Sequence, residues 1–165
     1  MLLKLALHED RAWTFPALAA ELSMSASEIH NAVTRARKAG LLDKGWRPNR
    51  AALVEFLVHG VRYAFAPQRG GITRGVPTAH GASPLVEELL ADGELPPVWP
   101  DAAGTVRGEG LSPLYKKAPQ AALRDPRLHE CLALLDAVRA GRTRERALAA
   151  KYLTERLKGH GREAA

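Results

Sequence analysis

The chain has 165 residues, the size of one ordinary domain, and it is long enough to bury a hydrophobic core. Its 24 Lys and Arg residues outnumber its 18 Asp and Glu residues, and the net charge of +6 favours an anionic partner. Hydrophobic residues make up 46% of the chain, which excludes a compositionally disordered protein. No apolar run reaches the roughly 18 residues that a membrane span needs. We therefore expect a soluble protein without a membrane partner.

Two short helices are predicted at the start of the chain. The apolar run at 2–9 is too short for the core of a secretion signal and indicates a helix instead. Thr14 is a candidate N-cap, and Pro16 suits a first helical turn because its missing N–H is tolerated there. A second helix is therefore expected over 15–22.

A third helix is predicted over 26–39, with clearer boundaries. Ser25 and Glu28 have the spacing of a capping box, in which each side chain accepts a hydrogen bond from the other residue's backbone N–H. Gly40 suits the left-handed position just past a helix end. The nearly all-apolar segment 51–58 then predicts a fourth helix, buried on more than one side as a central helix or a subunit contact.

The middle of the chain, residues 66–123, is predicted to be mainly irregular. It holds 8 of the 11 prolines and 8 of the 14 glycines. A short helix is expected over 83–90, and the rest has room for one short hairpin. The basic glycine-rich segment 68–75 lacks the Gly-Lys-Ser/Thr ending of a phosphate-binding loop. It is either a structural loop or a loop that follows a DNA backbone or minor groove.

A helical hairpin is predicted over 124–159. Asp125 as N-cap and Gly141 as the helix end give a helix over 126–140, and Thr143 begins the next one. The apolar faces of these two helices are expected to pack on the predicted fourth helix or across a twofold axis.

These elements divide the chain into four parts with different charges. They are an N-terminal domain at 1–65, the irregular segment 66–123, the hairpin 124–159 and a tail at 160–165. Residues 1–65 carry 9 basic and 6 acidic residues (+3), 66–123 carry 5 and 6 (−1), and 124–165 carry 10 and 6 (+4). Both ends of the chain are therefore basic.

The segment Leu18-Ala19-x-x-Leu22-Ser23-Met24-Ser25-x-x-x-Ile29-x-x-Ala32 resembles the helix-turn-helix motif of DNA-binding proteins. A small residue stands where the two helices cross, and a Ser opens the second helix, although Ser23 replaces the Gly that the motif favours. Downstream, Val33-x-x-Ala36-x-x-x-Gly40-Leu41-Leu42 resembles the end of the recognition helix in winged helix-turn-helix regulators of the MarR and GntR groups. The resemblance covers about residues 2–46 and implies a recognition helix over 26–39.

Helical periodicity separates a polar front from an apolar back on this third helix. At 100° per residue, the front holds Ser27, Asn31, Thr34 and Lys38 within about 60°, with His30, Arg35 and Arg37 on its flanks. The back holds Ile29, Ala32, Val33 and Ala36. Such a front is suited to the major groove, because Asn pairs with adenine and Arg or Lys with guanine through two hydrogen bonds.

The loop after the third helix is too short for the two-stranded wing of this family. Residues 43–47 are therefore expected to form a stub, with Lys44, Arg47 and Arg50 as phosphate contacts. Trp46 is expected either to plug the core or to stack on a base. Within the third helix, Ser27, His30, Asn31, Thr34 and Arg35 are expected to read the major groove, and Arg37 and Lys38 are expected to hold phosphates together with Lys44. The complete set of candidate DNA-binding residues is Ser25, Ser27, His30, Asn31, Thr34, Arg35, Arg37, Lys38, Lys44 and Arg47.

The sequence contains no pattern typical of an enzyme or a metal protein. The six histidines lack the spacings of metal-binding helices, and no serine stands in a nucleophile elbow. Cys131 is the only cysteine, which excludes an intramolecular disulfide and fits a reducing cytoplasm. We expect no cofactor, no metal and no catalytic activity.

The favoured interpretation is a prokaryotic, cytoplasmic transcription regulator that binds double-stranded DNA as a homodimer. Its expected fold is mainly α, with an N-terminal helix-turn-helix, a degenerate wing, an irregular middle and a C-terminal helical hairpin. One alternative is an antitoxin-like or adaptor protein that binds a partner protein through its middle and C-terminal zones, since any surface helix has a polar face. A second alternative is an RNA-binding protein.

Four arginines near the hairpin turn are interpreted as a solvated face, a phosphate contact or a contact with an acidic partner: Arg139, Arg142, Arg144 and Arg146.

Overall fold

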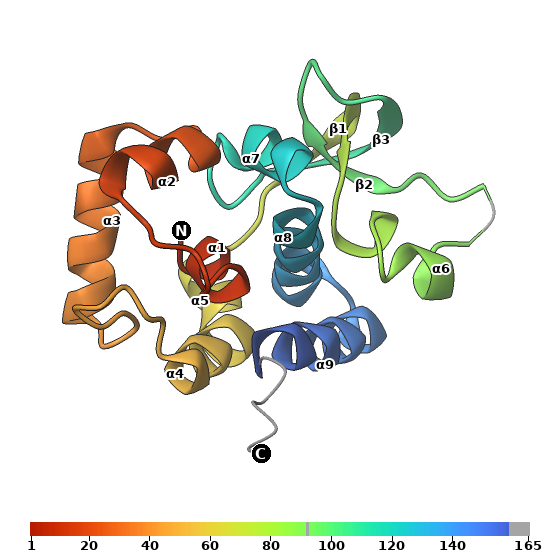
Figure 1. Ribbon diagram of the computed structural model, residues 1–165. Helices are drawn as coiled ribbons and strands as arrows, with labels where there is room; N and C mark the ends of the chain where they lie inside the picture. The colour runs from red at the N-terminus through yellow and green to blue at the C-terminus, as the bar shows by residue number, and fades with distance from the viewer. Residues whose placement is uncertain (92, 159–165) are drawn as a thin grey trace.

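The computed structural model describes residues 1–91 and 93–158 and is mainly helical, with one small three-stranded sheet (Figure 1). The predicted tail at 160–165 and the last residue of the predicted hairpin lie outside the described residues. Helix α8 (Pro126–Ala140) occupies the middle of the view in Figure 1, between the N-terminal helices and the sheet. The expectation of a mainly helical chain is confirmed at that level.

The three N-terminal helices form close to where their caps predict them. They are α1 (Leu2–Leu7), α2 (Phe15–Leu22) and α3 (Ala26–Lys38). Thr14 Oγ1 accepts a hydrogen bond from the Ala17 N–H at 3.3 Å, which confirms the cap of α2. Gly40 follows α3 with φ +70°, the left-handed conformation that ends a helix. Local capping chemistry therefore sets these helix ends; α1 is two residues shorter than the predicted 2–9, and α3 is one residue shorter than the predicted 26–39.

The fourth helix is longer than its apolar run predicts. It runs without a break through α4 (Arg50–Glu55), a π-helical turn η1 (Phe56–Gly60) and α5 (Val61–Ala64). Leu53, Leu57 and Val61 lie four residues apart and form its buried stripe. The helix packs against α8 and α9 (Thr143–Lys158). It retains exposed positions, such as Glu55, where the sequence predicts burial on more than one side.

The middle of the chain is more ordered than predicted. It contains β1 (Arg69–Pro77), η2 (Ala79–Gly81), α6 (Val86–Leu89), β2 (Pro97–Pro100), β3 (Val106–Leu111) and α7 (Ala118–Arg124). Strand β1 pairs antiparallel with both other strands, and β2 pairs with β3 in parallel, so the three strands close on one another. The glycine-rich segment expected as a loop is thus most of β1, and the expected single hairpin is wrong.

Glycine allows this closure because the strands approach too closely for side chains. A Cβ at Gly75 would overlap the carbonyl oxygen of Trp99, and one at Gly104 would overlap the backbone of Gly75. A Cβ at Gly108 would overlap the carbonyl oxygen of Pro96. The glycines that indicate irregular chain by composition therefore act here as sites of close backbone approach.

The C-terminal hairpin is confirmed, with helix α8 ending at Ala140, Gly141 as its C-cap and α9 beginning at Thr143. Its faces pack on the fourth helix of the same chain, which is one of the two arrangements expected. Every residue from Ala133 to Arg139 is buried, so α8 has core on all sides over this stretch. Two of these buried residues are charged, Asp136 and Arg139.

Buried charges connect α8 to the N-terminal helices. Lys4 on α1 is only 4% exposed, and its Nζ lies 2.6 Å from both Asp125 Oδ2 and Glu21 Oε2. Asp125 Oδ1 also caps α8 by accepting from the N–H groups of Arg127 and Leu128. Burial tends to raise the pKa of Asp125, but the hydrogen bonds from Lys4 and His8 and the cap bonds lower it to about 2. One carboxylate therefore starts α8 and holds it against α1.

A second buried carboxylate connects α8 to the sheet. Asp136 Oδ2 accepts from Thr78 Oγ1 at 2.9 Å and from Trp99 Nε1 at 2.5 Å. Its other oxygen pairs with Arg139, whose Nε donates to the Phe65 carbonyl at 2.8 Å. Each polar atom of this carboxylate is thus satisfied, as burial of a charge requires.

A Gly75→Ala change tests the close strand packing. We expect it to destabilise the protein by about 1 to 3 kcal/mol or more, because the new methyl group overlaps Trp99 backbone. The free energy of urea unfolding measures the loss. Gly71→Ala on the same strand is the matched control, since a Cβ there meets no described atom within 4 Å. Equal stability of the two variants would contradict the steric argument.

An Asp125→Asn change tests the ion pair through pH. Because the folded-state pKa of Asp125 lies below its unfolded value of 3.8, its charge stabilises the fold above about pH 4 and this contribution disappears as pH falls toward 2. At pH 7 the Asn variant, which keeps a capping oxygen, should be less stable by about 2 kcal/mol. The difference in unfolding free energy should shrink between pH 4 and pH 2. A difference independent of pH would show that the charge of Asp125 is not the cause.

Candidate nucleic-acid interface

Helices α2 and α3 are joined by a three-residue turn, Ser23–Ser25. Ser23 adopts the left-handed conformation with φ 54°, which accounts for the preference for Gly at this position in the motif that the sequence resembles. The Met24 N–H then donates to the Ala19 carbonyl at 2.9 Å and closes the end of α2. The turn is therefore set by α2's own carbonyls and by the cap of α3.

The cap of α3 is the predicted capping box. The Ser25 N–H donates to Glu28 Oε2 at 2.8 Å, and the Glu28 N–H donates to Ser25 Oγ at 3.2 Å. Ser25, a candidate DNA contact, thus has its hydroxyl oxygen occupied as an acceptor. Hydrogen bonds from the Ser25 backbone, Tyr115 and the Ser25 side chain lower the pKa of Glu28 to about 2, so this carboxylate is ionised at neutral pH.

The two faces of α3 are as the helical periodicity predicts. Ile29, Val33 and Ala36 are buried against the core, with at most 6% of each residue exposed. The seven candidate residues on the helix are all exposed: Ser27, His30, Asn31, Thr34, Arg35, Arg37 and Lys38. Among the described residues, the side chains of Asn31, Thr34 and Arg35 make no hydrogen bond. These three groups are therefore available to a ligand.

The predicted stub lies along one flank of α3. A single bridge between Leu42 and Pro48 closes it, in place of a two-stranded wing. Arg37 donates from Nε to the Asp43 carbonyl at 3.2 Å and from Nη2 to the Lys44 carbonyl at 3.1 Å. Arg37 is thus a brace that fixes the stub, whereas the sequence predicts a phosphate contact.

Aromatic packing fixes the same flank. Trp46 is half-buried, and its ring lies 4.9 Å from that of Phe15, with the Arg37 guanidinium 5.6 Å above it. The His30 ring also lies near the Phe15 ring, with the two ring centroids 5.7 Å apart. These contacts agree with the expectation that Trp46 packs against the core, and not with the alternative that it stacks on a base. Lys44 and Arg47 remain exposed on the stub.

Residues 112–117 lie on the other flank of α3. The sequence does not predict that this segment contacts the helix. Tyr115 Oη donates to Glu28 Oε1 at 2.7 Å, across 87 positions in the sequence. The neighbouring Lys116 and Lys117 are exposed. An aromatic residue followed by two lysines is the only local signal for this segment, and the predicted irregular middle gave no reason to place it at α3.

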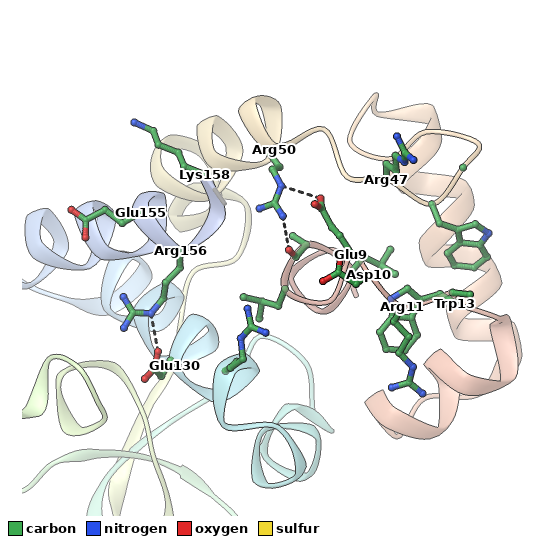
Figure 2. Close-up of a pocket in the computed structure, with 17 residues that line it drawn as sticks. Glu9, Asp10, Arg11, Trp13, Arg47, Arg50, Glu130, Glu155, Arg156 and Lys158 are labelled. Atoms are coloured by element: carbon green, nitrogen blue, oxygen red, sulfur yellow. Dashed lines mark hydrogen bonds and ion pairs between the residues drawn. The ribbon is translucent and has the colours of Figure 1, made fainter. Parts of the chain in front are cut away.

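A groove of about 1260 Å³ separates the N-terminal helices from α8 and α9 (Figure 2). Within it, Arg50 pairs with Glu9 at 2.9 Å and donates to the carbonyls of Ala6 and Leu157. Arg156 pairs with Glu130 at 2.8 Å on the opposite wall. Arg50, which the sequence predicts as a phosphate contact, has its guanidinium occupied by internal partners in this groove.

The other candidate functional residues do not form a site in the part of the chain that the structure describes. Among residues 1–91 and 93–158, no cluster of three His, Cys, Asp or Glu side chains could hold a metal, and no helix is long and apolar enough to cross a membrane. Cys131 is buried, and burial raises the pKa of its thiol to about 12. The C-terminal arginine run is divided, since Arg139 is buried and Arg142 and Arg144 are exposed.

The chain was compared with protein-family models, curated proteins and solved structures. None of the three comparisons finds a match.

Proposed function

We propose that the chain is a sequence-specific DNA-binding transcription regulator that reads the major groove with α3. The observation that carries this proposal is the exposed front of α3, where the side chains of Asn31, Thr34 and Arg35 make no hydrogen bond with other described residues and lie over an apolar back. The preceding short helix and the tight turn support a helix-turn-helix arrangement. In this arrangement α3 lies at the left edge of the molecule in Figure 1.

The exposed residues divide into two roles. Asn31 and Arg35 are the strongest candidates for base contacts, because each can make two hydrogen bonds with one purine edge. Ser27, His30 and Thr34 supplement them. Lys38 and the stub residues Lys44 and Arg47 contact phosphates, which fixes the position of the protein without reading sequence. Arg37 acts indirectly, by holding the stub.

The proposal includes a homodimer in a prokaryotic cytoplasm, since two half-sites multiply specificity. It assigns the chain no catalytic activity. A selected DNA consensus with twofold symmetry, together with the stoichiometry of the complex in sedimentation, would support the dimer. A single asymmetric half-site bound by one chain would contradict it.

Three substitutions on α3 test the groove assignment. Asn31→Ala and Arg35→Ala should each weaken binding to a site selected from random duplex DNA by about 1 to 3 kcal/mol and relax the preference at one base pair. Lys38→Ala should weaken binding to all sequences alike and reduce the slope of log affinity against log salt by about 1. Titration of labelled duplexes at several salt concentrations measures both effects.

The matched control is Lys151→Ala, an exposed position on α9 away from α3. Unchanged binding by both the Asn31 and Arg35 variants would overturn the assignment of α3. Stronger binding of structured RNA than of duplex DNA in direct competition would favour the RNA-binding alternative. A stoichiometric protein retained from native cells after nuclease treatment, without duplex binding by the pure chain, would favour the adaptor.

A further inference from the structure

Residues 112–117 and α7 are attached to the helix pair α2–α3 at two points. At one end, Tyr115 Oη donates to Glu28 Oε1 at 2.7 Å. At the other, Arg124 Nη1 donates to the Ala20 carbonyl at 2.9 Å. The first bond is with an ionised carboxylate, and such charge-assisted hydrogen bonds are stronger than neutral ones. The segment is thus held beside the N-terminal turn of α3.

The stub and this segment lie on opposite flanks of the front of α3. At 100° per residue from Ser27, Arg37 lies about 80° to one side of it, and Glu28 lies about 100° to the other. Arg37 holds the stub, and Glu28 holds Tyr115. The exposed front that carries Asn31 therefore faces outward between two loops.

Each of these two loops carries two exposed cations. Lys44 and Arg47 belong to the stub, and Lys116 and Lys117 follow Tyr115. The charge of Lys116 contributes to the lowered pKa of Glu28, after the hydrogen bonds from Ser25 and Tyr115, which places this lysine near the start of α3. The first turns of a recognition helix are the part that contacts bases.

The geometry points to a second phosphate contact. A helix in the major groove, which is about 12 Å wide, has one phosphate backbone on each side. We propose that Lys116 and Lys117 contact the backbone on the Glu28 side of α3, opposite the strand contacted by Lys44 and Arg47. Residues 112–117 then supply the phosphate contacts that a wing would supply on that flank. Tyr115 is the positioning residue, because its bond to Glu28 holds the segment against α3. This inference rests on the proposed function and adds to it a contact with the second DNA strand that borders the groove.

The test uses the full chain and a duplex selected by the wild-type protein. The double variant K116A/K117A should reduce the slope of log affinity against log salt by about 2, since each lost phosphate contact reduces it by roughly 0.9. Its base preference should remain that of the wild type, because phosphate contacts carry no sequence information. Y115F keeps both lysines and should weaken binding several-fold by releasing the segment. Lys151→Ala should change neither quantity.

Phosphate ethylation interference gives a second readout. The wild type should show interfering phosphates on both strands that border the bound groove, and K116A/K117A should lose those of one strand only. If the wild type binds the duplex while the double variant keeps its salt slope and both sets of phosphates, this inference is overturned and the proposed function stands. If the wild type binds no duplex, the proposed function fails and the inference fails with it. Circular dichroism of each variant verifies that these exposed substitutions leave the fold unchanged.

Discussion

The arrangement of the whole chain depends on the buried ion pair between Lys4 and Asp125. Lys4 is almost completely removed from water, and its ammonium group is satisfied by Asp125 and Glu21 at 2.6 Å each. Removing a partner from a buried charge destabilises a protein, and the loss of Asp125 is moderated here because Lys4 keeps Glu21 as its second carboxylate. Helices α1, α2 and α8 must therefore lie together for the buried Lys4 to have both of its carboxylate partners. Because Asp125 is also the N-cap of α8, the start of the central helix is fixed at the same point.

The position of the candidate interface follows from this constraint. Helix α7 ends at Arg124, immediately before Asp125, so fixing Asp125 against α1 also brings α7 to α2. The residues that precede α7 then reach the N-terminal turn of α3, where Tyr115 meets Glu28. Asp136, three turns farther along α8, holds the sheet through Thr78 and Trp99. One helix thus orients the sheet at its middle and the helix pair α2–α3 at its beginning.

The parts that could be predicted from the sequence are those set by local chemistry. Ser25 with Glu28, Gly40 and Asp125 act within one helical turn, and the helices end where they indicate. The front of α3 was predictable for the same reason, because a periodicity of 100° needs no tertiary information. The sheet was not, because the close approach of Gly75 to Trp99 depends on strands 24 residues apart. Neither the burial of Asp136 nor the contact of Tyr115 with Glu28 has a local signature, so the second flank of α3 was missed.

The same structure changes what the net charge means. By sequence, the excess of +3 in residues 1–65 belongs to the helix-turn-helix zone, and the middle zone, at −1, contributes nothing. In three dimensions, Lys4 and Arg50 of the first zone are occupied by internal pairs, while the exposed Lys116 and Lys117 of the middle zone directly follow Tyr115, which contacts α3. The net charge of each sequence zone therefore does not describe the electrostatic field that a polyanion would meet at the folded surface. For the proposed DNA contact, the relevant quantity is the number of exposed cations that border the front of α3, and these cations come from two segments of the chain that the ion pair at Asp125 brings together.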